Sequence, residues 1–158
     1  ILDRAPEHDF APTIDRVREV CELLGDPQRA YRVVHVTGTN GKTSTSRMVE
    51  RILREHGLRT GRFTSPHLSS VTERIAIDGE PISPARYVEV YREIEPFVEL
   101  VDKQSQAAGG PALSKFEVVT AMAFAAFCPV NWHLSSMLTT GIPFWKSTIS
   151  MLFSLDSE

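Results

Sequence analysis

The chain has few cysteines and no excess of positive charge. Its 158 residues include only 2 cysteines, Cys21 and Cys128, which are too few for a disulfide scaffold and lack metal-binding spacing. We therefore expect a reducing, cytoplasmic environment. Lys and Arg number 17 against 20 Asp and Glu, so we expect no nucleic-acid partner. Asp3, Arg4 and Glu7 stand where a signal peptide needs its apolar core, so we expect no signal peptide.

Charged side chains become scarce towards the end of the sequence. Residues 128–158 contain only Lys146, Asp156 and Glu158, whereas residues 1–127 contain 34 charged side chains. This break predicts a tail of different origin, such as a frameshifted or divergent segment. Residues 118–145 carry no charge, and about 20 apolar residues can span a bilayer. Proline and polar residues interrupt the run, so we expect no membrane span.

Apolar spacing, caps and breakers predict four helices and three strands. The helices are expected at 11–24, 43–56, 84 to about 104, and 115–127. The strands are expected at 32–37, 58–64 and 74–78. Thr13 and Ser114 are the expected N-caps of the first and last helices, and Pro96 should bend or break the third. A strand, glycine turn, helix and strand in this order indicate a βαβ unit and an α/β fold.

Several side chains are expected in the core. The first helix should bury an apolar stripe that includes Ile14 and Cys21, and the second should bury one that includes Met48 and Ile52. Residues 32–37 read as a buried parallel strand, which would make His35 a core residue. Cys21 is expected to be an inert buried thiol.

The most informative segment joins the first predicted strand to the second predicted helix. It reads Thr37-Gly38-Thr39-Asn40-Gly41-Lys42-Thr43-Ser44. Its glycines permit unusual backbone angles and the close approach of an anion. Successive N–H groups of the loop and of the helix N-terminus can bind phosphate. Lys42 can supply a mobile charge to the β- and γ-phosphates, and Thr43 or Ser44 can place a hydroxyl on Mg²⁺.

The segment departs from the strict Walker pattern, because Val36 stands where that pattern has its first glycine. For an isolated Gly-Lys-Thr, a tight structural turn would be an equal alternative. The strand before the segment and the helix after it favour phosphate binding. A free-standing kinase-like P-loop enzyme is another reading, although no acidic residue follows a later apolar strand.

Residues 38–44 resemble the nucleotide loop of the Mur ligase superfamily. Further strings narrow the resemblance to the folylpolyglutamate synthases and their bifunctional dihydrofolate synthase relatives. These strings are Thr64-Ser65-Pro66-His67-Leu68, Glu73-Arg74-Ile75, Gly79-Glu80-Pro81-Ile82-Ser83 and residues 116–124. The likeness covers about residues 10–127.

The resemblance implies the N-terminal ATP-binding portion of an ATP-dependent amide ligase, with ATP and Mg²⁺ as cofactors. In this family ATP phosphorylates a folate or dihydropteroate carboxylate, and the amine of L-glutamate attacks the acyl phosphate. A metal ion and a lysine offset the repulsion between the two anions and stabilise the transferring phosphoryl group. The implied partners are therefore small molecules.

The resemblance also implies residue roles. It makes Lys42 the catalytic residue, and it assigns nucleotide binding to Gly38, Thr39, Asn40, Gly41, Lys42, Thr43 and Ser44. It places a metal ion at Thr43, Ser44 or Ser65. Substrate contacts are implied for Pro66, His67, Arg74 and Glu117. The residues alone leave other roles open. His67 could be a local hydrogen-bonding residue, and Glu73 and Arg74 could form an exposed ion pair. Glu117 could be a helix cap.

The resemblance ends near Phe127. The family's later metal ligands, its carbamylated lysine and its C-terminal domain have no counterpart in residues 128–158. We therefore expect a Rossmann-like P-loop domain that is truncated at its C-terminal side (1–127) and is followed by an unmatched tail (128–158). We expect this chain to be inactive alone. An open alternative is a non-catalytic remnant that binds nucleotide weakly or folds partly. A sheet without its later strands would have an unpaired edge, so we expect a monomer if intact and association if truncated.

Overall fold

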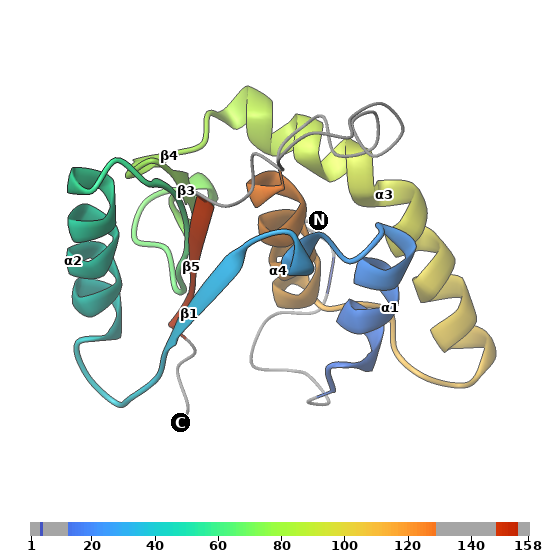
Figure 1. Cartoon of the computed structure of the whole chain (residues 1–158). Coiled ribbons are helices and arrows are strands. Elements are labelled where there is room, and N and C mark those ends of the chain that lie inside the picture. The colour runs from blue at the N-terminus through green and yellow to red at the C-terminus, as the bar shows by residue number, and fades with distance from the viewer. Residues whose placement is uncertain (1–3, 5–12, 129–147, 155–158) are drawn as a thin grey trace, which may run out of the picture. The chain divides into compact units, whose positions relative to one another are not determined.

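The computed structural model of the chain (Figure 1) describes Arg4, residues 13–128 and, as backbone only, residues 148–154. Its contacts divide the chain into two compact units. The helical unit comprises residues 1–28 and 88–126, and the sheet unit comprises residues 29–87 and 127–158.

The described part of the helical unit contains three α-helices. These are α1 (Asp15–Leu23), most of α3 (Pro84–Ala107) and all but the last residue of α4 (Lys115–Phe127). Their buried apolar side chains form its core, with Val20, Ile94, Val98, Val118 and Met122 each 0% exposed. Cys21 is also buried, as expected from the sequence.

Two expectations for the helical unit need correction. Ile14 is 67% exposed, because α1 turns Arg16, Val20 and Cys21 inward instead. Of the two effects expected of Pro96, a bend or a break, the break does not occur, because α3 runs on to Ala107. Proline removes one backbone hydrogen bond from a helix. Pro96 lies on the exposed side of α3, and the fully buried residues before and after it hold the helix together by packing.

The N-terminus of α4 is fixed by a reciprocal pair of hydrogen bonds, which confirms Ser114 as its cap. The Glu117 N–H donates to Oγ of Ser114 at 3.3 Å, and the Ser114 N–H donates to Oε2 of Glu117 at 2.7 Å. This is the capping-box arrangement. At α1 the Thr13 hydroxyl accepts from the Asp15 N–H at 3.1 Å, although the residue in the capping position is Ile14.

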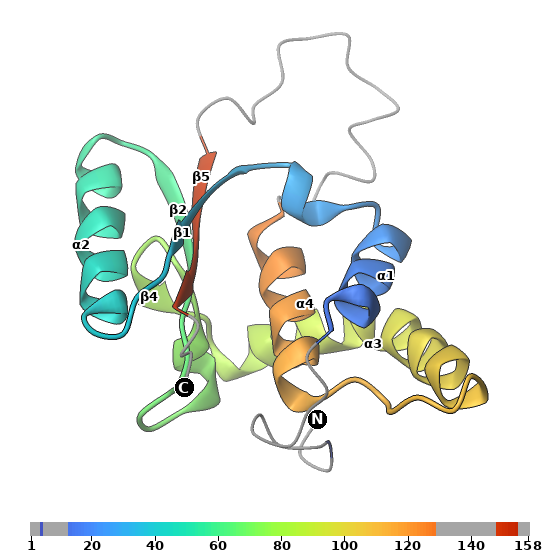
Figure 2. The same ribbon diagram turned by 90° about the horizontal axis from the view of Figure 1, so that it is seen from below.

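The sheet unit is built on five strands in the order β1-β5-β2-β3-β4. Their bounds are β1 (Arg32–Val36), β2 (Arg59–Phe63), β3 (Ile75–Ile77), β4 (Glu80–Pro81) and β5 (Thr148–Ser154). Strands β1 and β2 both pair in parallel with β5, while β3 and β4 continue the sheet antiparallel. Helix α2 (Lys42–Glu55) runs along one side of the strands, as Figures 1 and 2 show. The predicted α/β fold with parallel strands is confirmed.

Strand β5 changes the expectation for the end of the chain. The sequence after Cys128 has no lasting periodicity and could not be assigned to helices or strands, and we expected a parallel sheet without its later strands. Residues 148–154 instead form a strand between β1 and β2, with Val34 opposite Met151 and Gly61 opposite Ser150. The weak periodicity of this segment hid the strand, because a strand paired on both sides need not alternate polar and apolar residues.

Burial in the sheet unit also differs from the sequence expectation. Val33 and Val34 are 45% and 38% exposed, and His35 is exposed as well, because β1 lies at the edge of the described sheet. Met48 and Ile52 are 59% and 57% exposed. The buried face of α2 is polar and consists of Lys42, Ser46 and Glu50. The expected apolar contact of α2 is therefore wrong.

No helix in the described ranges is long and apolar enough to cross a membrane. Most of the uncharged stretch 118–145 lies outside the described residues.

Candidate functional site

The predicted phosphate loop and Ser65 belong to the same edge of the sheet. The loop follows the carboxyl end of β1, and Thr64 and Ser65 follow the carboxyl end of β2. Because β1 and β2 are both parallel to β5, these two ends point the same way. The carboxyl edge of a parallel sheet is where ligands bind in open α/β folds. The topology therefore gives the two segments a common location.

Gly41 gives the phosphate loop its shape. It is the N-cap of α2 and has φ 76°, a left-handed conformation that costs other L-residues about 1–2 kcal/mol. In the described part of the chain, no protein carbonyl accepts from the backbone N–H groups of Thr39, Asn40, Gly41, Thr43 or Ser44. A row of unused N–H groups at a helix N-terminus is the arrangement that binds phosphate.

Lys42 lies within this loop rather than in solvent. It is buried, and its Nζ donates to the carbonyl oxygen of Gly38 at 2.5 Å. No acidic residue lies in the first turn of α2, so nothing there opposes an anion at the positive end of the helix dipole. A phosphate group could take the place of the Gly38 carbonyl as acceptor without moving the lysine far.

The hydroxyl groups predicted for a metal ion come from two segments. Ser44 is exposed and Thr43 half-buried in the first turn of α2, whereas Ser65 is buried beyond β2. Among the described residues no cluster of three His, Cys, Asp or Glu side chains could hold a metal ion. The metal roles of these three hydroxyl residues stay predictions.

The loop after Ser65 is organised around Glu73. Its carboxylate accepts from the N–H groups of Leu68, Ser69 and Ser70 at 3.0, 3.2 and 3.0 Å. These bonds lower the pKa of Glu73, with the bond from Leu68 having the largest effect. Ser70 caps the short helix η2 (Val71–Arg74) in return. Glu73 thus has a structural role, as an anchor for three successive amides.

Arg74 and His67 contact each other directly. The Nε of Arg74 donates to Nδ1 of His67 at 2.9 Å, and Arg74 is 4% exposed. His67 is half-buried and follows Pro66, which has a cis peptide bond and an exposed ring. The hydrogen-bonding interpretation of His67 is therefore the one this geometry supports. Substrate roles for Pro66, His67 and Arg74 stay predictions.

Glu117 belongs to the helical unit, where both of its carboxylate oxygens have partners. Oε1 accepts from Nε and Nη2 of Arg16 at 3.0 and 2.9 Å, and Oε2 accepts from the Ser114 N–H. The residue is 2% exposed. These contacts explain a glutamate within an apolar helix as a cap and ion-pair partner, and a substrate role stays a prediction.

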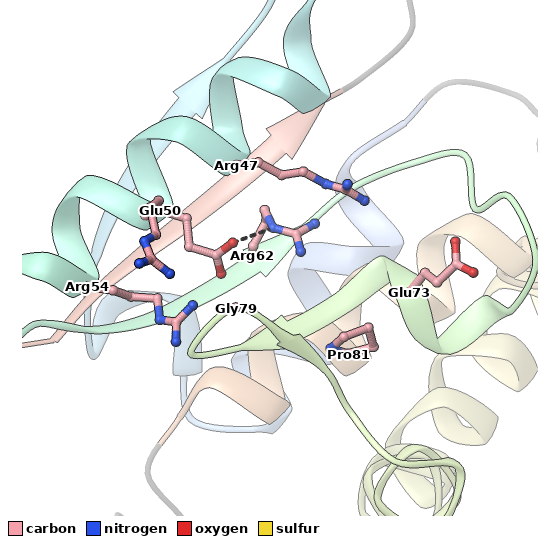
Figure 3. A pocket seen from close by; sticks show the side chains of 8 residues that line it. Arg47, Glu50, Arg54, Arg62, Glu73, Gly79 and Pro81 are labelled. Carbon is pink, nitrogen blue, oxygen red and sulfur yellow. Dashed lines mark hydrogen bonds and ion pairs between the residues drawn. The ribbon is translucent and has the colours of Figure 1, made fainter.

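A buried ion pair in the sheet unit was not expected from the sequence. Nε of Arg62 in β2 donates to Oε2 of Glu50 in α2 at 2.7 Å, and both side chains are 5% exposed. The pair lines a cavity (Figure 3). The sequence did contain a sign of a polar buried face on α2. Lys42, Ser46 and Glu50 are spaced four residues apart, which places them on one side of the helix.

We compared the chain with known proteins to find those with a similar sequence or fold. No protein-family profile matches the chain. The dihydrofolate synthase/folylpolyglutamate synthase of Mycobacterium tuberculosis is 60% identical over 131 residues, which are 80% of this chain and 27% of that protein. The crystal structure of the M. tuberculosis folylpolyglutamate synthase with ADP and AMPPCP has a TM-score of 0.74 and 50% identity over 89% of this chain and 28% of that one.

A third structure adds a metal and an amino acid. A bifunctional folylpolyglutamate synthase/dihydrofolate synthase with Mn, AMPPNP and L-glutamate bound has a TM-score of 0.68 and 28% identity over 94% of this chain and 31% of that one. The chain thus spans about a quarter to a third of the length of these three proteins.

The fold and the loop after β1 define an α/β, Rossmann-like P-loop domain. The similarity extends along most of this chain and falls on the N-terminal part of the relatives. The chain is therefore similar to the N-terminal part of folylpolyglutamate synthases and dihydrofolate synthases, and the resemblance seen in the sequence is confirmed.

Proposed function

We propose that the chain is the ATP-binding portion of an amide ligase that adds L-glutamate to a folate or dihydropteroate carboxylate. The observation that carries this proposal is the phosphate loop, with its unused N–H groups and buried lysine at the carboxyl edge of the sheet. The homology supports the ligase class, since relatives with these names bind ADP, AMPPCP or AMPPNP.

In this proposal the chain's own groups position the triphosphate. ATP supplies the phosphoryl group that activates the carboxylate. The N–H groups of residues 39–44 bind the phosphate oxygens, and Gly41 keeps them directed at the same point. Lys42 exchanges its Gly38 partner for a phosphate oxygen and offsets the charge that develops during transfer.

The proposed metal is Mg²⁺, which would help to neutralise the charge of the nucleotide phosphates. The relative with Mn and AMPPNP bound supports a divalent ion as a cofactor. Hydroxyl, phosphate and water oxygens are the ligands that Mg²⁺ prefers. Thr43 or Ser44 would supply the hydroxyl from α2, and Ser65 the one from the segment after β2.

Nucleotide binding and ligation are separate parts of this proposal. The 158-residue chain matches 27% of the length of its 60%-identical relative. We expect the 158-residue chain to bind ATP without ligating. Equilibrium binding of ATP with and without Mg²⁺ tests the first part. Incubation with ATP, Mg²⁺, dihydropteroate and L-glutamate tests the second, and a ligated product would contradict it.

A further inference from the structure

Two buried charged residues join α2 to β2. Nε of Arg62 donates to Oε2 of Glu50 at 2.7 Å, and both side chains are 5% exposed. Figure 3 shows the side chain of Arg62 directed at that of Glu50. A buried ion pair is often no more favourable than apolar residues of the same volume, so stability alone is a weak reason for its presence. A second contact of Arg62 gives the pair a further role.

Arg62 also contacts the segment that leads to Ser65. Its Nη1 donates to the hydroxyl oxygen of Thr64 at 3.3 Å. Residues two apart along a strand point to the same face, so this contact lies on the side of β2 from which Arg62 reaches α2. Thr64 is 5% exposed and directly precedes Ser65, which is 8% exposed. The guanidinium therefore connects Glu50 of α2 to the residue before Ser65.

The backbone of Thr64 is held by another element. Its N–H donates to the carbonyl oxygen of Arg74, the last residue of η2, at 2.9 Å. The side chain and the backbone of Thr64 thus have separate partners. The direction in which the chain leaves β2 towards Ser65 depends on both contacts.

The other end of this network belongs to the helix that begins at the phosphate loop. Lys42, Ser46 and Glu50 form the buried face of α2, and Oγ of Ser46 donates to the carbonyl oxygen of Lys42 at 3.0 Å. Glu50 lies about 12 Å along the helix from Lys42. Because α2 is a continuous helix of 14 residues, it fixes the distance between Glu50 and the first turn.

We propose that Arg62 is a positioning residue, which sets Ser65 relative to the phosphate loop through the hydroxyl group of Thr64. Glu50 holds the guanidinium on α2, and the guanidinium holds Thr64. The inference rests on the proposed function, in which Ser65 supplies a hydroxyl group to Mg²⁺. This ion requires nearly ideal octahedral geometry, so a small displacement of the hydroxyl group would weaken its coordination.

A T64V variant separates this role from simple stabilisation, because it removes the hydroxyl group and keeps the Glu50–Arg62 pair. Nuclear magnetic resonance of the labelled chain without any ligand measures the backbone order parameter of Ser65. We expect this value to fall in T64V from about 0.85, typical of a rigid backbone, towards about 0.6. T64S keeps the hydroxyl group and should retain the original value.

The matched control is T60V. Thr60 lies on the same strand and is 2% exposed, and its hydroxyl oxygen has no hydrogen-bond partner in the described part of the chain. T60V should therefore leave the order parameter of Ser65 unchanged.

A double variant tests the pair itself. R62L alone would leave Glu50 buried without a partner, which is strongly destabilising. E50L/R62L replaces both charges by apolar side chains and should fold, but it lacks the donor to Thr64. We expect the order parameter of Ser65 to fall in E50L/R62L as it does in T64V.

Calorimetric titration with ATP, with and without Mg²⁺, tests the functional consequence. The ratio of the two affinities should fall about threefold or more in T64V and in E50L/R62L, and stay unchanged in T60V. An unmodified chain whose ATP affinity does not respond to Mg²⁺ would contradict the proposed metal role, while the order parameter of Ser65 would still decide whether Arg62 positions it. An unchanged order parameter in T64V and E50L/R62L would overturn the inference. So would an unchanged affinity ratio in these variants, if Mg²⁺ strengthens ATP binding to the unmodified chain.

Discussion

The guanidinium of Arg16 in α1 forms an ion pair with the carboxylate of Glu117 in α4, 101 residues along the chain, at 2.9 Å. The same carboxylate caps α4 through the Ser114 N–H. Glu117 therefore joins two helices and fixes the start of one of them.

Replacing Glu117 should destabilise the chain strongly. In E117A, Arg16 would be buried without a partner and the α4 cap would be lost, so we expect a loss of about 3–5 kcal/mol. E117Q keeps an acceptor for Ser114 and should lose less. E99A is the control, because the Glu99–Lys103 pair is exposed and contributes about 0.5 kcal/mol or less. Urea unfolding measures all three, and equal losses in E117A and E99A would contradict the structural role.

A substitution at Gly41 should affect both stability and nucleotide binding. Alanine in a left-handed conformation costs about 1–2 kcal/mol, and relief of that strain would turn the N–H groups of the loop away from a common point. Asparagine tolerates this conformation better, so G41N should be less destabilised than G41A. Thermal unfolding compares the two variants. Equal stability of G41A and the unmodified chain would show that φ at this position is not left-handed.

The Cys21 thiol should make stability fall at alkaline pH. Burial raises its pKa to about 12, with smaller contributions from Asp26 and Glu22. Because the folded-state pKa is the higher one, this stabilisation is present below the unfolded-state pKa near 9 and is lost as pH rises from about 9 to 12. The slope should reach about 1.4 kcal/mol per pH unit.

Urea unfolding measures the free energy of unfolding of the unmodified chain and of C21A at several pH values between about 8 and about 11. The difference in free energy of unfolding between the two should shrink as pH rises. A pH-independent difference, or rapid alkylation of Cys21 in the folded chain at neutral pH, would be inconsistent with a buried protonated thiol.

The loop around Glu73 should loosen in acid. The pKa of this carboxyl is lowered by the N–H groups of Leu68, Ser70 and Ser69, so its contribution is present above the unfolded-state pKa and is lost as pH falls through the lower, folded-state value. The amide resonances of Leu68 and Ser70 should therefore titrate together, with a midpoint below 4.5. The E73Q variant is the control and should show no such transition. Amides of the unmodified chain that do not respond to acid would contradict the contacts.

Local signals in the sequence predicted the helices and the glycine-containing loop before α2. The spacing around Ser114 and Glu117 and the apolar run after them predicted α4 at its observed bounds. The position of the glycine-lysine segment between a strand and a helix predicted the loop that Gly41 shapes. Caps and turns depend on neighbouring residues, so the chain encodes them within a few positions.

Features that depend on distant partners could not be predicted in this way. The polar face of α2 is buried because Arg62 of β2 pairs with Glu50, and no local pattern contains that pairing. His35 is exposed because β1 lies at the edge of the described sheet. Strand β5 has its place only through pairing with β1 and β2.

The central claim is that the N–H groups of residues 39–44, together with Lys42, bind the phosphates of ATP. Nuclear magnetic resonance titration of the labelled chain with ATP and Mg²⁺ tests it most directly. We predict that the amide resonances of Thr39–Ser44 shift on binding, and that K42A weakens the affinity about tenfold or more while K103A, at an exposed lysine, does not. Unshifted loop amides, or equal affinity in K42A and the unmodified chain, would contradict the claim.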